Sequence, residues 1–140
     1  MILSKSFVME RERYDGADVA HLILALGAKL DWERLLSRFE KNWRVLFAHL
    51  VLFGFIYPAE RSRVPNWVMR ELHARMRAEH ATQSHAEHVC QGTLLSREQF
   101  LIDIQDWGYN DARLTTGAMT EAQIEHWTRG IDNLRLLKET

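Results

Sequence analysis

The chain has 140 residues, the length of one ordinary domain with a substantial apolar core. Eighteen Lys and Arg residues oppose nineteen Asp and Glu residues, so the formal net charge is only -1. This balance excludes a global field that would steer the protein toward nucleic acid, an anionic membrane or an acidic substrate. We therefore predict a single helical domain over residues 1–140, with neither nucleic acid nor a membrane among its partners.

Cysteine usage and the apolar segments predict a cytoplasmic protein. Cys90 is the only cysteine, which rules out an internal disulfide and suits a reducing compartment. Residues 1–8 lack an apolar stretch followed by a small-residue cleavage site, so no signal peptide is predicted. The longest apolar run, residues 45–57, is interrupted by His49 and Gly54 and is shorter than the ~20 residues of a membrane-spanning helix.

The elements expected along the chain are helices, because prolines and glycines are few and apolar residues recur at three- and four-residue spacing. The first expected helix covers Ile2–Arg13. A second helix begins after Asp15, a good N-cap residue, and stops at Gly27. A third helix, Trp32–Glu40, begins after the N-cap residue Asp31.

The fourth expected helix, about residues 42–57, has apolar residues around most of its circumference, so other helices must surround it. Pro58 ends this helix because proline lacks an amide donor, and Pro65 opens a fifth helix that runs from Trp67 to about Glu79. We therefore predict an all-α fold, a compact bundle of about six to seven helices around the central apolar helix.

The second half of the chain has weaker patterns. Residues 80–95 are expected to form an exposed loop, because most of them are polar and show little apolar periodicity. Two capping-box patterns follow, Ser96 with Gln99 and Thr120 with Gln123, and each introduces a further helix with an apolar face. No strand and no internal repeat are expected.

The densest group of chemically active residues lies near the amino end, in Lys5–Asp18. The surrounding block, Ser4–Leu22, resembles the helical C-terminal part of bacterial nucleotidyltransferase-like proteins. Four further segments carry the same resemblance: Leu30–Leu36, His49–Phe53, Cys90–Arg97 and Trp107–Tyr109. The resemblance therefore covers most of the chain.

The resemblance implies a nucleotide-facing site. In that superfamily, a sheet domain carries a Gly-Ser turn and paired aspartates that hold Mg²⁺ on a nucleoside triphosphate, and a following helical segment faces the nucleotide. Carried onto this sequence, the resemblance makes Lys5 a phosphate-facing cation and makes Arg11, Asp15 and Asp18 residues that order the site or the nucleotide.

The catalytic motif of that superfamily is not present, since the sequence contains neither Gly-Ser nor Asp-x-Asp. The resemblance therefore implies a truncated, substrate-side or structural helical domain that is inactive alone and has no cofactor of its own. Mg²⁺ and a nucleoside triphosphate are implied for a complete family member. The implied partner is a catalytic sheet domain, on this protein or on another chain.

The same residues also have a purely structural interpretation. Asp15 is an N-cap, Asp18 is a first-turn acid favoured by the helix dipole, and Arg11 belongs to a solvated charged face. The second hypothesis is therefore a non-enzymatic helical interaction or oligomerisation module, either a homo-oligomer or a protein that binds a partner. An exposed apolar seam would identify such a module.

A third hypothesis is a metal-binding domain. His85, His88 and Cys90 offer imidazole and thiolate ligands that suit Zn²⁺, although their spacing matches no standard zinc motif. Alternatively, the histidines decorate a polar loop and Cys90 packs as a small hydrophobe. His49 lies on the apolar central helix, where we expect a hydrogen-bonded core histidine and not a catalytic base.

Overall fold

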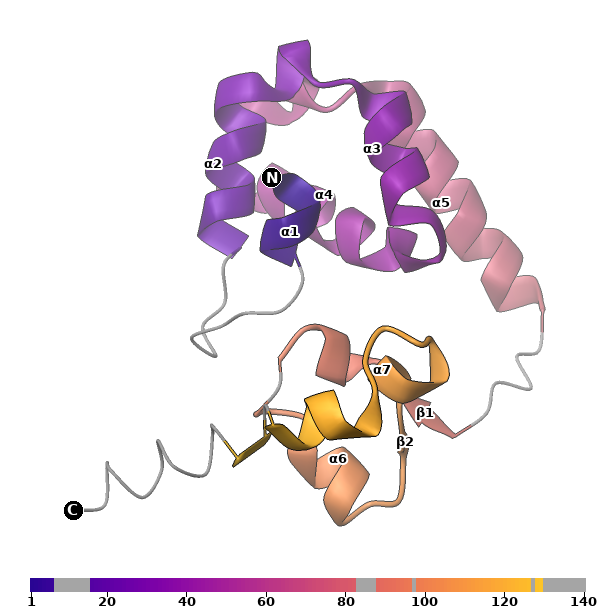
Figure 1. Ribbon diagram of the computed structural model, residues 1–140. Helices are drawn as coiled ribbons and strands as arrows, with labels where there is room; N and C mark the ends of the chain where they lie inside the picture. Colours follow the sequence, from indigo (N-terminus) through magenta and orange to yellow (C-terminus); the bar gives the residue numbers. More distant parts are fainter. Residues whose placement is uncertain (7–15, 83–87, 97, 127, 130–140) are drawn as a thin grey trace. The chain divides into compact units, whose positions relative to one another are not determined.

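The computed structural model describes residues 1–6, 16–82, 88–96, 98–126 and 128–129. Within these residues the secondary structure is almost entirely helical and the strands form one two-residue pair, which confirms the all-α class. The chain divides into two compact units (Figure 1). The described residues of unit 1 are 1–6 and 16–82, and those of unit 2 follow from residue 88. The single domain predicted over residues 1–140 stays a prediction.

The described part of unit 1 consists of α-helices joined by short 3₁₀ turns. Its elements are α1 (Ile2–Ser6), α2 (Gly16–Leu26), η1 (Gly27–Lys29), α3 (Trp32–Phe39), η2 (Glu40–Asn42), α4 (Trp43–Ile56), η3 (Pro58–Arg63) and α5 (Asn66–Ala81). The second to fifth helices expected from the sequence are thus confirmed to within a few residues. The first expected helix is observed over Ile2–Ser6, and residues 7–13 lie outside the described residues.

Helix α4 is the centre of unit 1, where it contacts α1, α2, α3 and α5. Its inward residues Leu46, Leu50 and Phe53 are at most 2% exposed. The neighbouring helices cover them with further buried side chains: Val19 and Ile23 of α2, Phe39 of α3, and Val68 and Leu72 of α5. Because each buried side chain of this size contributes about 1.5–3 kcal/mol, packing around α4 is the main force that holds unit 1 together.

Local sequence explains where α3 begins. The Asp31 carboxylate accepts a hydrogen bond from the Arg34 amide at 3.0 Å, which confirms Asp31 as the N-cap. The preceding turn needs glycine, because a Cβ atom at Gly27 would lie 2.8 Å from the carbonyl oxygen of Arg63. The Trp32 indole N–H donates to the Gly27 carbonyl at 2.9 Å and ties this turn to the helix.

The end of α4 is fixed by a proline and an arginine. A helix carbonyl normally accepts a hydrogen bond from the amide four residues later, but Pro58 has no amide hydrogen to offer the carbonyl of Gly54. Arg61 donates its Nε–H to that carbonyl at 2.9 Å. The arginine thus replaces the missing donor and places a cation at the negative end of the helix dipole.

Unit 2 contains shorter elements. They are β1 (Val89–Cys90), η4 (Gly92–Leu94), α6 (Leu101–Gln105), β2 (Asn110–Asp111) and α7 (Ala112–Thr115), and residues 121–126 are also helical. Thr120 and Gln123 form the predicted capping box, with amide-to-side-chain hydrogen bonds of 2.9 and 3.3 Å. None of the helices in the described residues is long and apolar enough to cross a lipid bilayer.

The structure differs from the sequence expectation over residues 80–95. Helix α5 continues to Ala81, residues 83–87 lie outside the described residues, and β1 pairs in parallel with β2 although no strand was expected. Thr93 is 2% exposed, and its buried hydroxyl is satisfied by donating to Asp111 Oδ1 at 2.9 Å. Hydrophobic periodicity reports only local patterns, so it could not reveal a hydrogen bond between two residues that are 18 positions apart.

Phe53 and Phe55 allow a matched test of the role of α4, because they are 0% and 80% exposed on the same helix. We expect Phe53→Ala to lower the free energy of unfolding by about 3–5 kcal/mol, since it leaves a cavity in the core. We expect Phe55→Ala to change it by less than about 0.5 kcal/mol. Urea denaturation followed by circular dichroism measures both changes, and similar losses would contradict this packing.

Candidate functional site

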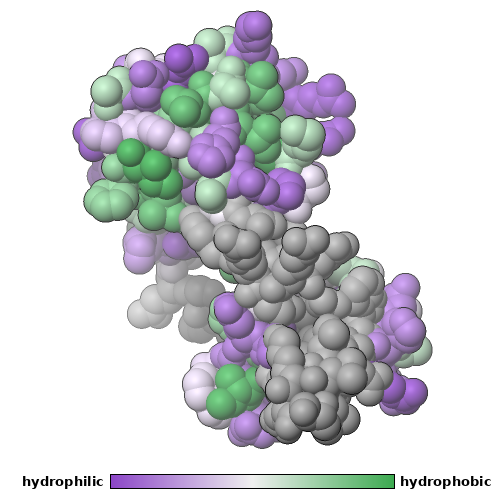
Figure 2. Space-filling model, turned by 90° about the vertical axis from the view of Figure 1, so that its left-hand side faces the viewer, coloured by the Kyte–Doolittle hydropathy of each residue, from purple (hydrophilic) through white to green (hydrophobic). Residues whose placement is uncertain are grey.

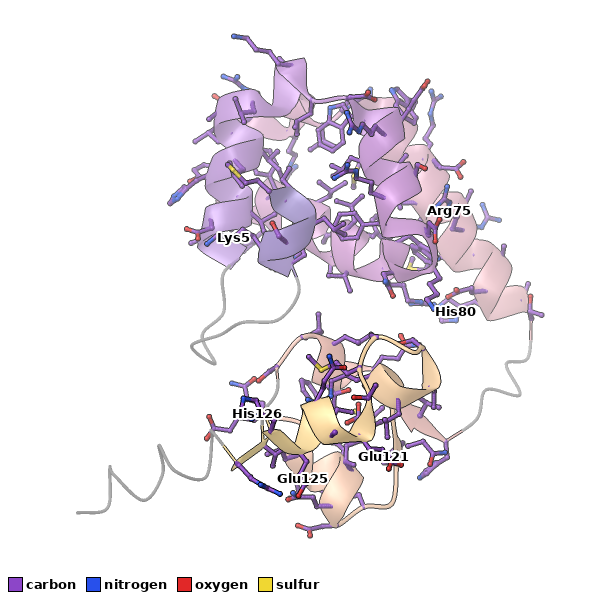
Figure 3. The ribbon with its side chains drawn as sticks, in the orientation of Figure 1. Lys5, Arg75, His80, Glu121, Glu125 and His126 are labelled. Carbon is purple, nitrogen blue, oxygen red and sulfur yellow. The ribbon has the colours of Figure 1, made fainter. Side chains whose placement is uncertain are left out.

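Two of the four residues implied by the resemblance are described, and they are in contact. Lys5 lies near the end of α1, and Asp18 lies in the first turn of α2. Lys5 Nζ is 2.9 Å from Asp18 Oδ2, so the two side chains form an ion pair across the helices. Figure 3 shows Lys5 beside the start of α2. Arg11 and Asp15 lie outside the described residues.

The backbone beneath this ion pair is anchored in the core. Ile2 and Ser6 of α1 are buried, and the Ser6 hydroxyl donates to the Ile2 carbonyl at 2.9 Å. Lys5 and Asp18 remain 45% and 50% exposed at the surface above them. An exposed ion pair contributes about 0–1 kcal/mol, so the contact between Lys5 and Asp18 adds little to the packing of the two helices.

The zinc hypothesis is only partly covered by the described residues. His88 stacks on Tyr109, with ring centroids 3.8 Å apart and planes 15° apart, and Cys90 in β1 is a half-buried free thiol. His85 lies outside the described residues. Among the residues that are described, no three His, Cys, Asp or Glu side chains are placed to hold a metal ion. Zinc binding by His85, His88 and Cys90 stays a prediction.

A buried ion pair in unit 2 was not found by sequence reasoning. Arg113 Nη2 donates to Asp111 Oδ2 at 2.6 Å, and both side chains are at most 5% exposed. Asp111 Oδ1 also accepts the Arg113 amide at 2.9 Å, as an N-cap of α7. Burial raises the pKa of Asp111, but hydrogen bonds from Arg113 and Thr93 and the arginine charge outweigh it and lower the pKa overall. Because protein donors occupy both oxygens, this cluster is structural.

One side of α4 is exposed, although other helices were expected to surround this helix. Val51, Leu52, Phe55 and Ile56 are 54%, 40%, 80% and 44% exposed. Figure 2 shows apolar residues among hydrophilic ones on one face of unit 1. Hydrophobic periodicity identifies an apolar helix but does not show which of its sides has a neighbour, so the sequence could not reveal this exposed apolar face.

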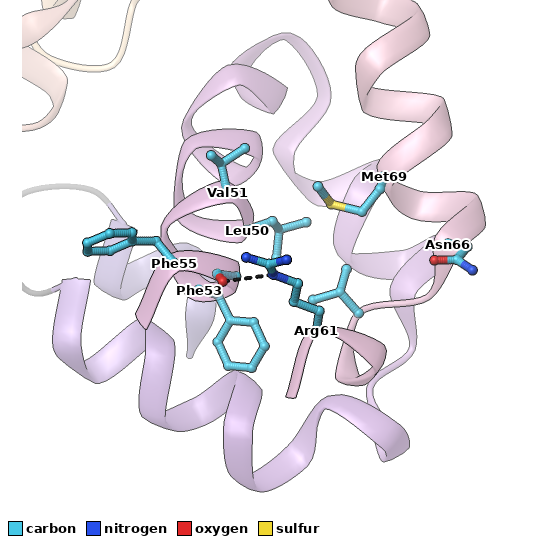
Figure 4. A pocket seen from close by; sticks show the side chains of 9 residues that line it. Leu50, Val51, Phe53, Phe55, Arg61, Asn66 and Met69 are labelled. Atoms are coloured by element: carbon cyan, nitrogen blue, oxygen red, sulfur yellow. Dashed lines mark hydrogen bonds between the residues drawn. The ribbon is translucent and has the colours of Figure 1, made fainter. Parts of the chain in front are cut away.

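A groove of about 510 Å³ lies beside this face, between α4, η3 and α5. It is lined by Leu50, Val51, Phe53, Gly54, Phe55, Arg61, Val64, Asn66 and Met69. Figure 4 shows the Arg61 guanidinium against α4, with Leu50 and Met69 close by. The groove therefore combines apolar walls with one positively charged group.

A second groove, of about 600 Å³, lies between α3 and α5. It contains Trp67 together with Arg70 and Arg75, and also Glu33 and Glu71. Arg75 Nε lies 2.8 Å from Glu71 Oε1. Because the acids balance the arginines, this groove offers no strong field for a nucleic acid backbone.

Comparison of the chain with protein-family models, curated proteins and solved structures found no match. The assignment of a function therefore depends on the residues described above and on the resemblance carried by the sequence.

His49 is 8% exposed, and burial lowers its pKa below the usual value. The unfolded chain therefore binds a proton more readily than the folded chain, and the stabilising contribution of neutral His49 is complete above about pH 6.5. This contribution is lost as the pH falls from there through the lower pKa of the folded state. We expect the free energy of unfolding to decrease between pH 7.5 and pH 5, as measured by urea denaturation.

A substitution at His49 tests the origin of this pH dependence. We expect His49→Gln to reduce the slope of unfolding free energy against pH, because glutamine does not titrate in this range. Equal slopes in the wild type and in His49→Gln would contradict the role of His49.

Proposed function

We propose that this chain is the helical, substrate-side domain of a nucleotidyltransferase-like protein and that it works with a catalytic sheet domain. The observation that carries the proposal is the contact between Lys5 and Asp18. The resemblance assigns both residues to one nucleotide-facing group, and they lie on different helices whose packing brings their side chains within 2.9 Å.

The chemistry of the pair supports this role. A lysine ammonium binds a phosphate oxygen as a compact charge with three donors. A carboxylate held next to it suits a hydroxyl group or a Mg²⁺ ion of the bound nucleotide. In the structure the two side chains form an ion pair in which each charge offsets the other. Binding would exchange this pair for contacts to the nucleotide.

Nucleotide titrations test the proposal. We expect saturable binding of at least one of ATP, GTP, CTP and UTP with Mg²⁺, measured by calorimetry and by amide shifts around Lys5 and Asp18. Lys5→Met removes one charge-assisted hydrogen bond and should weaken binding at least about tenfold. Lys29→Met, at an exposed lysine of η1, is the matched control and should leave affinity unchanged. No saturable binding by any of the four nucleotides would contradict the proposal.

A turnover assay tests the second part of the proposal, that the chain does not act alone. We expect no Mg²⁺-dependent nucleotidyl transfer by the isolated chain, because the sequence contains neither Gly-Ser nor Asp-x-Asp. Turnover that is abolished by Asp18→Asn would show a catalytic centre within the chain and would overturn this part.

The second candidate is a helical interaction module, and the exposed apolar face of α4 favours it. Large exposed apolar patches on a protein surface usually mark a site where a partner binds. Phe55, which is 80% exposed, is the most exposed residue of this face. The nucleotide titration separates the two candidates, since a pure interaction module would show no saturable binding. Light scattering then reports whether the module associates with itself.

A further inference from the structure

We propose that the groove beside α4 binds a peptide segment of a partner protein that presents apolar anchors next to a carboxylate. This inference deepens the interaction-module candidate and rests on it. It does not depend on the nucleotide proposal.

The apolar part of the groove fits side chains of a partner. Leu50 and Phe53 form a buried floor, while Val51 and Phe55 stand exposed at its edge. Met69 of α5 borders the opposite side, and its flexible thioether adapts to partners of different shape. Exposed apolar side chains beside a concave apolar floor are typical of grooves that receive a peptide or helix.

Arg61 supplies the polar part and gives the groove its charge preference. Its Nε–H donates to the Gly54 carbonyl at 2.9 Å, which fixes the guanidinium against the end of α4. Among the described residues, its two terminal nitrogens have no ion-pair partner, whereas Arg63 pairs with Glu60 and Arg44 pairs with Glu79. A guanidinium held in this way presents two parallel donors, and a carboxylate is the group that accepts both.

Charge complementarity therefore favours an occupant that carries a negative charge. An apolar segment with an Asp or Glu satisfies the walls and the guanidinium together, while a basic segment would place two cations side by side. A second copy of this chain is the competing occupant.

Selection from a library of displayed 12-residue peptides against the immobilised full chain tests this inference. We expect enriched peptides to combine large apolar residues with Asp or Glu, and to bind the wild type in solution by fluorescence anisotropy. Arg61→Glu should weaken the binding of these peptides at least about tenfold, because it replaces attraction between Arg61 and the peptide carboxylate by repulsion between two carboxylates. A selection repeated on Arg61→Glu should enrich Lys or Arg in place of the acids.

Two further variants separate the groove from the rest of the surface. Val51→Ser removes an exposed apolar side chain from the edge of the groove without changing the buried core, and it should also weaken peptide binding. Arg70→Glu reverses the charge of an exposed arginine of α5 outside this groove and should leave peptide binding unchanged. Circular dichroism and urea denaturation of each variant measure whether the fold is kept, because Arg61 also satisfies the Gly54 carbonyl at the end of α4.

Three outcomes would overturn the inference. Enriched peptides that bind Val51→Ser and Arg61→Glu as tightly as the wild type would leave an interaction module but place its site elsewhere. If no peptide were enriched, both the proposed use of the groove and the interaction-module candidate would be contradicted. The result of the nucleotide titrations would not be affected. Self-association that Val51→Ser abolishes, seen by light scattering, would make a second copy the occupant.

Discussion

The burial of one side of α4 is the constraint on which the rest of unit 1 depends. Leu46, Leu50 and Phe53 are the residues around which α1, α2, α3 and α5 assemble. Helix α2 packs on α4 and α1 packs on α2, so Lys5 and Asp18 meet at the surface as a consequence of that packing. The opposite side of the same helix remains exposed. One apolar helix thus determines the geometry of both candidate sites.

The end of α4 shows how a single sequence feature connects fold and surface chemistry. Pro58 cannot donate to the Gly54 carbonyl, which would otherwise be an unpaired acceptor at the end of the helix. Arg61 satisfies that carbonyl and is fixed by the same hydrogen bond. The guanidinium is therefore held next to the apolar residues of α4. The same arginine that completes the hydrogen bonding of the helix end therefore places a positive charge in the groove beside α4.

Features that depend on neighbouring residues could be predicted from the sequence. The N-cap at Asp31, the stop at Gly27 and the break at Pro58 each follow from the chemistry of a few adjacent positions. Contacts between distant residues could not be predicted in this way, and the buried Asp111–Arg113 pair with Thr93 is the main example. For the candidate site, the resemblance named Lys5 and Asp18 but could not give their distance. The exposed side of α4 was missed because an apolar pattern does not show which neighbours are present.

Amide hydrogen exchange on the full chain tests most directly the claim that α4 organises unit 1. The account predicts that the amides of residues 46–53 exchange only through global unfolding, with a free energy equal to that obtained from urea denaturation. Those at the ends of α5 should exchange through smaller, local openings. Exchange of residues 46–53 at the rate of the ends of α5 would contradict the account, because the helix at the centre of the core would then open independently of it.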